Sequence, residues 1–188
     1  MSEWNKKRRT MRHYNHSAKV YDALYTQEQS AKIEKALENQ PLKKQSLILD
    51  VGCGTGLLFP YVMEKAKLIV GADISAGVLT EAKKKAKQCC KVALLRADAD
   101  HAPFIDHVFD VVFAITLLQN MPDPQQTLSE TKRVSKSNSF IVATGLKKTF
   151  SIEEFVEMLR KAELEILEVK ADSRQKEHIA LCTKQHTS

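Results

Sequence analysis

Short apolar runs alternate with amphipathic helical patterns from Ser46 onward, and this alternation constrains the fold more than any other feature of the chain. Strands that alternate with helices lie parallel in one sheet, with the helices packed on its two faces. We therefore expect an α/β fold. Seven runs are predicted to be strands: Leu47–Val51, Leu68–Ala72, Val92–Leu95, Val108–Ile115, Phe140–Thr144, Ile166–Val169 and His178–Thr183.

Four segments carry the signals that start a helix. A glutamate or glutamine three residues after a serine or threonine completes a capping box, as in Ser151 with Glu154 and Thr26 with Gln29. A proline directly after a capping residue also favours a helix start. Helices are therefore predicted to begin at Thr26, at Ser75, at Asp123 with Pro124 in the first turn, and at Ser151.

The size and composition of the chain fit one globular domain. A chain of 188 residues buries enough surface to fold without a disulfide or a structural metal. Its four cysteines show none of the paired spacings of zinc sites, so we expect reduced thiols and no metal. The sequence contains no apolar stretch near the ~20 residues of a membrane span. No apolar segment follows the basic amino terminus either, so we expect a cytoplasmic protein.

Positive charge is concentrated at the amino terminus. Residues 1–20 hold six basic side chains against one acid, Glu3, so they carry a net +5 of the formal +6. Such an arm can hold phosphates, but a short charged terminus is more often solvated and mobile. We favour the second reading slightly. The basic residues are Lys6, Lys7, Arg8, Arg9, Arg12 and Lys19.

Three glycines at alternate positions, Gly52, Gly54 and Gly56, follow the first predicted strand. Glycine is needed where a Cβ would collide with a ligand or where φ is positive. Strand, turn and helix start together let the backbone approach a ligand. The dinucleotide fingerprint has glycines at relative positions one, three and six, whereas these lie at one, three and five. The spacing therefore argues against a pyrophosphate ligand.

With Asp50 before it, the segment "DVGCGTG" resembles the signature of the class I methyltransferases that use S-adenosyl-L-methionine. The segments "VGADIS" and "RADADHAPF" resemble the next two motifs of these enzymes, in order and at the expected spacing. "FDVVFAITLLQNMPDP" and "HYNHSAKVYD" are similar to the subfamily of the ubiquinone and menaquinone C-methyltransferases, the methyltransferase type 11 group. The resemblance covers about residues 13–183.

This resemblance implies a single-domain Rossmann-like fold with a seven-stranded, mostly parallel sheet and an antiparallel last strand. It divides the chain into a basic arm with N-terminal lid helices at residues 1–40 and a methyltransferase core at residues 41–188. It implies S-adenosyl-L-methionine as cofactor, with Asp73 on the ribose hydroxyls and Asp98 and Ala99 on the adenine. The implied cofactor-binding residues are Tyr21, Asp50, Gly52, Cys53, Gly54, Gly56, Asp73, Ile74, Asp98, Ala99 and Thr116.

The chain departs from the family pattern in two ways. Ala97 replaces the usual glycine and Ala102 the usual leucine, which are small changes at the adenine loop. An Asn-Pro-Pro-Tyr-type motif is absent after the fourth strand, where "TLLQNMP" stands instead. That absence argues against methylation of amide or exocyclic amine nitrogens.

Methyl transfer from a sulfonium needs alignment more than a conspicuous catalytic group. Where the acceptor has to lose a proton, a base could contribute roughly 10²–10⁴-fold. The candidate bases are Tyr14, His16 and His101, although each also fits a structural role: an aromatic packing in a lid, a solvated residue and a loop residue, respectively.

Acceptor contacts are expected from the carboxyl ends of the strands. The candidate substrate-binding residues are Tyr14, Tyr25, Leu117, Gln119, Asn120 and Lys147. We lean slightly to a small metabolite as the acceptor. The alternative is RNA, such as tRNA, or a protein bound through the arm with Lys6, Lys7, Arg8, Arg9 and Arg12. A third reading is a regulatory module that binds the cofactor without turnover and pairs with a protein partner through the third strand, "KVALLRAD", at the sheet edge.

Overall fold

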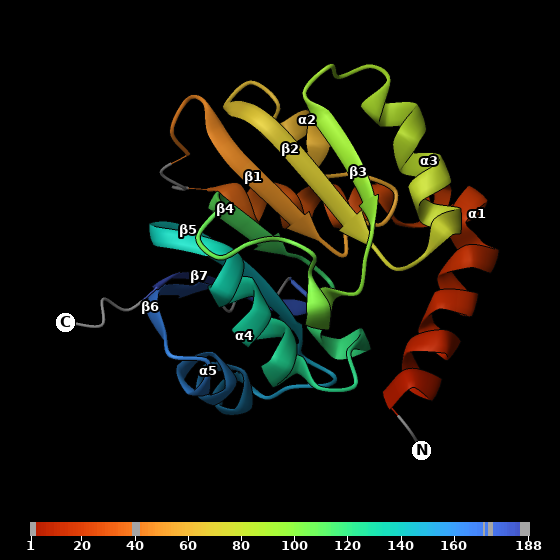
Figure 1. The fold of residues 1–188 in the computed structure, drawn as a ribbon. Coiled ribbons are helices and arrows are strands. Elements are labelled where there is room, and N and C mark those ends of the chain that lie inside the picture. The colour runs from red at the N-terminus through yellow and green to blue at the C-terminus, as the bar shows by residue number, and fades with distance from the viewer. Residues whose placement is uncertain (1–2, 39–41, 171, 173–174, 185–188) are drawn as a thin grey trace.

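One seven-stranded sheet forms the centre of the molecule, with strand order β3-β2-β1-β4-β5-β7-β6 (Figure 1). The computed structural model describes residues 3–38, 42–170, 172 and 175–184. The strands are β1 (Ser46–Val51), β2 (Ala66–Asp73), β3 (Val92–Arg96), β4 (Phe109–Ala114), β5 (Ser135–Leu146), β6 (Leu164–Lys170) and β7 (Glu177–Lys184).

The strand directions confirm the predicted fold class. The pairs β1–β2, β2–β3, β1–β4 and β4–β5 are parallel. The last strand, β7, lies between β5 and β6 and is antiparallel to both. β3 and β6 are therefore the edges of the sheet, as predicted for the third strand.

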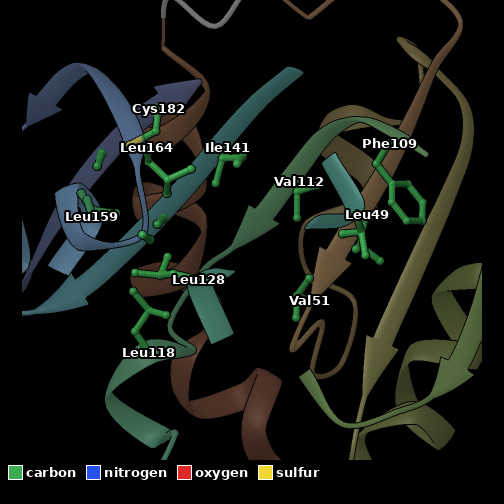
Figure 2. Packing of buried hydrophobic residues seen from close by; sticks show 14 of the residues in the cluster. Leu49, Val51, Phe109, Val112, Leu118, Leu128, Ile141, Leu159, Leu164 and Cys182 are labelled. Atoms are coloured by element: carbon green, nitrogen blue, oxygen red, sulfur yellow. The ribbon is translucent and has the colours of Figure 1, made fainter. Parts of the chain in front are cut away.

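Helices cover both faces of the sheet, and alternate residues of each strand supply the two cores. They are α1 (Glu3–Leu37), α2 (Phe59–Val62), α3 (Ala76–Ala86), α4 (Pro124–Val134) and α5 (Ile152–Lys161). One core joins Leu49 and Val112 of the sheet to Leu128 of α4 and Leu159 of α5 (Figure 2). The other packs α1, α2 and α3 against the opposite side chains of the same strands: Ile33, Ala36, Ile48, Phe59, Ala82, Val111 and Phe113.

Three of the four predicted helix starts are confirmed. Ser75 accepts a hydrogen bond from the Val78 N–H, and Asp123 accepts from the first turn of α4. Ser151 forms a complete capping box with Glu154. Each cap satisfies backbone N–H groups that have no partner inside the helix.

The fourth predicted helix start, at Thr26, is wrong. α1 is one unbroken helix of 35 residues that passes through this position. The Thr26 hydroxyl donates to the Asp22 carbonyl within the helix, at 2.6 Å, instead of capping a new one. The N-terminal region is thus one helix and not several, and residues 3–20 are helical rather than a loose arm.

Two further elements differ from prediction. β5 begins at Ser135, five residues before the expected Phe140. The helix expected directly after the glycines is the single turn α2. The predicted domain boundary between residues 40 and 41 lies outside the described residues. Within the part of the chain that the structure describes, no helix is long and apolar enough to cross a membrane.

Candidate functional site

A cavity lies at the carboxyl ends of the central parallel strands, where open α/β sheets bind ligands. Its walls come from the turn after β1, the end of β2, the loop after β3 and the loop after β4. One face of α1 closes it, with Lys7, Met11, Tyr14, Tyr21 and Gln29 in the lining. α1 also lies beside α3 (Figure 1), so a helix from the start of the chain completes a site built by the sheet.

The turn from Gly52 to Gly56, which we call the glycine turn, is tightly bonded to the chain itself. Gly52 and Cys53 donate their backbone N–H groups to the Ala72 carbonyl, at 2.8 and 3.1 Å. Gly54 donates to Asp73 and Gly56 to the Cys53 carbonyl, at 3.0 and 2.9 Å. These four N–H groups are therefore occupied, which agrees with a turn that does not cradle a phosphate.

The three glycines all have a positive φ, but their surroundings differ. A Cβ at Gly52 would lie 2.8 Å from Leu117, and one at Gly56 would lie 2.4 Å from the Phe59 ring. The chain's own packing therefore opposes a side chain at both positions, more strongly at Gly56, where the neighbour is a ring, than at Gly52, where it is the end of a leucine side chain. A Cβ at Gly54 would meet nothing within 4 Å, and Gly54 lines the cavity. Of the three, Gly54 is the position that leaves room for a ligand.

Asp73, at the end of β2, is fixed by two backbone donors. Its Oδ1 accepts from Ser75 N at 2.8 Å, and its Oδ2 accepts from Gly54 N at 3.0 Å. Each oxygen keeps a second lone pair for a ligand hydroxyl. Burial raises the pKa of this carboxyl, and the two backbone hydrogen bonds oppose that rise.

Asp50 lies deeper in the cavity and is only 4% exposed. Burial, together with the nearby charge of Asp73, raises its pKa from the ordinary 3.8 to about 8. Asp50 is therefore protonated at neutral pH in the free protein. A ligand cation placed against it would favour loss of this proton.

Asp98, after β3, is held by a cation from α1. Lys7 Nζ lies 2.8 and 2.7 Å from the two Asp98 oxygens and 2.6 Å from Asp100 Oδ2. Burial lowers the Lys7 pKa, but the hydrogen bonds and charges of the two aspartates outweigh it, so the pKa is raised. Thr127 of α4 donates to the other Asp100 oxygen at 2.5 Å. Lys7 thus ties α1 to the loop after β3.

Two more polar contacts hold α1 over the cavity. Asn15 Oδ1 accepts from the Ser75 hydroxyl and from Gly77 N, both at 2.7 Å. Asp22 accepts from the Thr55 hydroxyl of the glycine turn and from Lys85 of α3, both at 2.5 Å. The helix is therefore anchored to three segments that form the cavity wall.

The other end of the cavity, which we call the aromatic end, contains Tyr14, Tyr21, Thr116 and Asn120. The two tyrosine rings lie 6.1 Å apart between centroids. Asn120 Nδ2 donates to the Tyr14 hydroxyl at 3.1 Å and to the Thr116 carbonyl at 2.9 Å. Gln29 Nε2 donates to the Tyr21 hydroxyl at 3.4 Å. Both phenols are thus oriented by side-chain amides.

A buried ion pair lies behind the aromatic end. Lys32 Nζ contacts Glu177 Oε1 at 2.6 Å, and both side chains are 2% exposed. The same ammonium donates to the Thr116 hydroxyl at 2.7 Å and to Gln29 Oε1 at 3.2 Å. A buried charge pair needs such additional hydrogen bonds to offset its desolvation. Lys32 therefore fixes two side chains that line the cavity.

The structure brings most of the residues expected at the site together. All the expected cofactor-binding residues except Gly56 line the cavity, as do Tyr14, Leu117 and Asn120 of the expected acceptor set. Six expected residues are outside its lining: Gly56, His16, His101, Tyr25, Gln119 and Lys147. Lys147 instead donates to the Asp172 carbonyl at 2.7 Å.

The two histidines proposed as bases are both exposed, His16 on α1 and His101 at the end of a short 3-10 turn. The sequence did not predict Lys7, Gln29 and Lys32 as residues of the site: Lys7 was assigned to the basic arm and Gln29 to a capping box. Helical spacing could have found the first two, because residues 7, 11, 14, 18, 21 and 29 share one helix face. This spacing applies to Gln29 only if one helix continues through Thr26, and the sequence predicted a new helix start there.

The fold and this cavity define an α/β protein that binds a ligand at the carboxyl ends of its parallel strands. The family model described as a methyltransferase domain matches residues 49–143, and the chain belongs to this family. This confirms the resemblance seen in the motifs.

Named relatives and solved structures agree with this family. The chain is 30% identical over 148 residues to a malonyl-[acyl-carrier protein] O-methyltransferase of Hamiltonella defensa, covering 76% of this chain and 56% of the relative. It is 32% identical over 112 residues to a demethylmenaquinone methyltransferase of Staphylococcus saprophyticus, covering 58% and 48%. A SAM dependent methyltransferase from Aquifex aeolicus has a similar fold, with a TM-score of 0.73 at 20% identity and coverage of 81% and 89%. The chain spans about half the length of the curated relatives it matches.

Proposed function

We propose that this protein transfers a methyl group from S-adenosyl-L-methionine to a small-molecule acceptor. The observation that supports this most strongly is the cavity in which Asp73, Asp98 and Gly54 meet at the ends of three neighbouring strands. The occupied N–H groups of the glycine turn fit a nucleoside that carries no phosphate. Membership in the methyltransferase domain family supports the same cofactor.

Each part of the cofactor has a matching group in the cavity. Asp73 suits the two ribose hydroxyls, because both its oxygens are fixed and each keeps a lone pair. Asp98 and the Ala99 backbone suit the adenine edge, next to Lys7. Asp50 suits the ammonium of the amino-acid end, and Gly54 leaves space for the chain that joins it to the ribose.

The bound cofactor supplies a methyl group on a positively charged sulfur. The protein's contribution is to hold that group and the acceptor in line and to exclude water. α1 suits the second task, because it closes the cavity and is anchored at Lys7, Asn15 and Asp22. The acceptor then occupies the aromatic end.

A small acceptor is favoured over RNA by the direction of the arm's side chains. Lys7 is turned inward to the two aspartates, and Lys6 donates to the Met121 carbonyl at 2.5 Å. The arginines Arg8, Arg9 and Arg12 remain exposed, and they are the observation that favours RNA as a second candidate. The β3 edge stays a predicted surface for a protein partner, and the regulatory reading without turnover stays an alternative.

Transfer of radiolabelled methyl from the cofactor to a whole-cell extract tests these readings together. We expect label in the small-molecule fraction. Label that is sensitive to ribonuclease would favour RNA, and label sensitive to protease would favour a protein acceptor. Cofactor binding without any transfer would favour the regulatory module. A steep fall of tRNA binding with added salt, with a slope of log K against log salt that Arg9→Gln lowers by about one, would further support RNA.

A further inference from the structure

We propose that the acceptor is a carboxylic acid, bound as its carboxylate by the hydroxyl groups of Tyr14 and Tyr21 and methylated on oxygen. This inference rests on the proposed function and specifies the substrate class at its aromatic end. It follows from the orientation of two amide side chains and from the absence of a suitable base among the described cavity residues.

Tyr14 has a free hydrogen to donate because of Asn120. The Asn120 amide nitrogen faces the Thr116 carbonyl at 2.9 Å, and only the NH₂ end of an amide can bond to a carbonyl oxygen. The same nitrogen donates to the Tyr14 hydroxyl at 3.1 Å. The phenol is therefore an acceptor in that bond, and its own hydrogen is left for a ligand.

Tyr21 is oriented in the same way by a longer chain of contacts. The buried pair of Lys32 with Glu177 holds a cation next to Gln29. The ammonium attracts the Gln29 carbonyl oxygen, at 3.2 Å, and this turns the amide nitrogen toward the Tyr21 hydroxyl at 3.4 Å. Tyr21 accepts from the amide and keeps its hydrogen for a ligand. Lys32 is thus a positioning residue for this phenol.

Both phenols stay protonated at neutral pH. Burial is the largest cause that raises the pKa of each, and neighbouring tyrosines add to it. They are therefore hydrogen-bond donors rather than bases. Both rings line the same cavity, with centroids 6.1 Å apart, and the proposal assigns their two free hydrogens to one group that has two acceptor oxygens.

The described residues that line the cavity include no histidine. Asp98 is paired with Lys7, and Asp73 accepts two backbone N–H groups. Asp50 is protonated at neutral pH in the free protein, and in the complex the proposed ligand ammonium pairs with it. A site built this way suits an acceptor that arrives already ionised. At neutral pH a carboxylic acid has already lost its proton, whereas an alcohol, an ammonium group or an ordinary phenol still carries it.

The reaction balances without a proton transfer. One carboxylate oxygen attacks the methyl carbon and forms the new C–O bond, while the C–S bond breaks and its electron pair stays on sulfur. A sulfonium and a carboxylate become a neutral thioether and a neutral methyl ester. The exposed arginines Arg8, Arg9 and Arg12 on α1 would attract such anions toward the same side of the molecule.

Alkali treatment of the labelled product tests the proposal. The protein is incubated with methyl-labelled cofactor and a small-molecule extract of its expression host, and the product is exposed to mild alkali. Methyl esters hydrolyse and release volatile labelled methanol, whereas methyl ethers, amines and carbon-bound methyl groups do not. We expect volatile label. Alkali-stable label in small molecules would overturn the carboxylate proposal and leave the proposed function standing. No transfer to small molecules while calorimetry still shows cofactor binding would overturn both. Absence of cofactor binding would instead overturn the proposed function.

Three variants test the role of the phenols. Tyr14→Phe and Tyr21→Phe remove one donor to a charged group, so each should lower ester formation about 10- to 100-fold. Asn120→Asp should cause a similar loss, because a carboxylate there would take the Tyr14 hydrogen for itself. Cofactor affinity measured by calorimetry should change less than threefold in Tyr14→Phe and in Asn120→Asp. Tyr61→Phe, a partly exposed tyrosine on α2 that is outside the cavity lining, is the matched control. Full ester-forming activity in both Tyr14→Phe and Tyr21→Phe would contradict the assignment.

Discussion

Gly54 and Gly56 share a positive φ, but a side chain would meet open space at Gly54 and the Phe59 ring at Gly56. Changing Gly54 to alanine should cost only the backbone strain, about 1–2 kcal/mol of unfolding free energy. Gly56→Ala adds a methyl group 2.4 Å from the Phe59 ring and should cost about 2–5 kcal/mol. Denaturant unfolding of both variants measures this difference.

The order should reverse for cofactor binding. Gly54→Ala places a methyl group in the cavity space and should weaken binding strongly in calorimetry despite its smaller effect on stability. Equal binding by Gly54→Ala and the unaltered protein would show that the ligand does not approach this turn.

The raised pKa of Asp50 predicts that cofactor binding releases a proton. Its pKa of about 8 means that the free protein holds this proton at pH 7. A ligand ammonium stabilises the charged carboxylate and lowers the pKa, so binding at pH 7 should release a proton, and affinity should rise with pH toward 8. Calorimetry in buffers of different ionisation enthalpy counts the protons. Asp50→Asn should abolish the release, and an unchanged release in that variant would contradict the assignment.

At this scale the sequence predicted the acidic residues best. Asp50, Asp73 and Asp98 were expected from the family resemblance, and each lies at or just after the carboxyl end of a strand, so the parallel strands bring them together. Lys7 was not predicted, because its partners Asp98 and Asp100 lie more than 90 residues away. Such a contact depends on where a helix packs, which no local pattern specifies.

At the scale of elements, α1 covers the carboxyl ends of the parallel strands and so completes the cavity. Lys7→Met keeps much of the side-chain volume but leaves Asp98 and Asp100 facing each other without a cation. We expect unfolding free energy to fall by about 1–3 kcal/mol, since partly buried carboxylates lose their hydrogen-bond partner.

The only tryptophan of the chain, Trp4, lies one turn before Lys7 and reports on this helix. Its fluorescence anisotropy should fall in Lys7→Met as the first turns of α1 loosen. Arg9→Met, at an exposed position of the same helix, is the control and should change neither quantity. Unchanged anisotropy and stability in Lys7→Met would mean that the salt bridges do not anchor α1.

The wrong helix start predicted at Thr26 has a physical explanation. Thr26 with Gln29 matches a capping box, yet the helix continues because α1 is held on both sides of that point, by Asp22 and by Lys32. Tertiary contacts override a local start signal that is worth only about 1 kcal/mol. Ser75, Asp123 and Ser151 follow a strand or a loop, where no helix competes, and their caps were predicted correctly.

At the scale of the whole molecule, the sheet could be predicted because its central strands are apolar on both faces. Ile48 and Leu49, adjacent in β1, enter opposite cores, and Val111 and Val112 of β4 do the same. Two-sided burial of this kind is typical of parallel sheets. The order of the strands came from the family resemblance instead, since periodicity carries no information about which strands are neighbours.

The acceptor could not be predicted from sequence for a related reason. The aromatic end combines Tyr14 and Tyr21 of α1 with the loop after β4, and the ion pair of Lys32 with Glu177 of β7 lies behind it. These segments are far apart in the chain and their polar contacts depend on side-chain orientation. Localisation in the cytoplasm likewise stays a prediction from composition.

Calorimetric titration with S-adenosyl-L-methionine and with its demethylated product tests the central claim most directly. We predict saturable heat for both ligands and an affinity at least about 50-fold lower in Asp73→Ala, because two hydrogen bonds to a charged acceptor are lost. Asp106→Ala, an exposed carboxylate paired with Arg133, should bind as the unaltered protein does. No heat with either ligand, or an unchanged affinity in Asp73→Ala, would contradict the account.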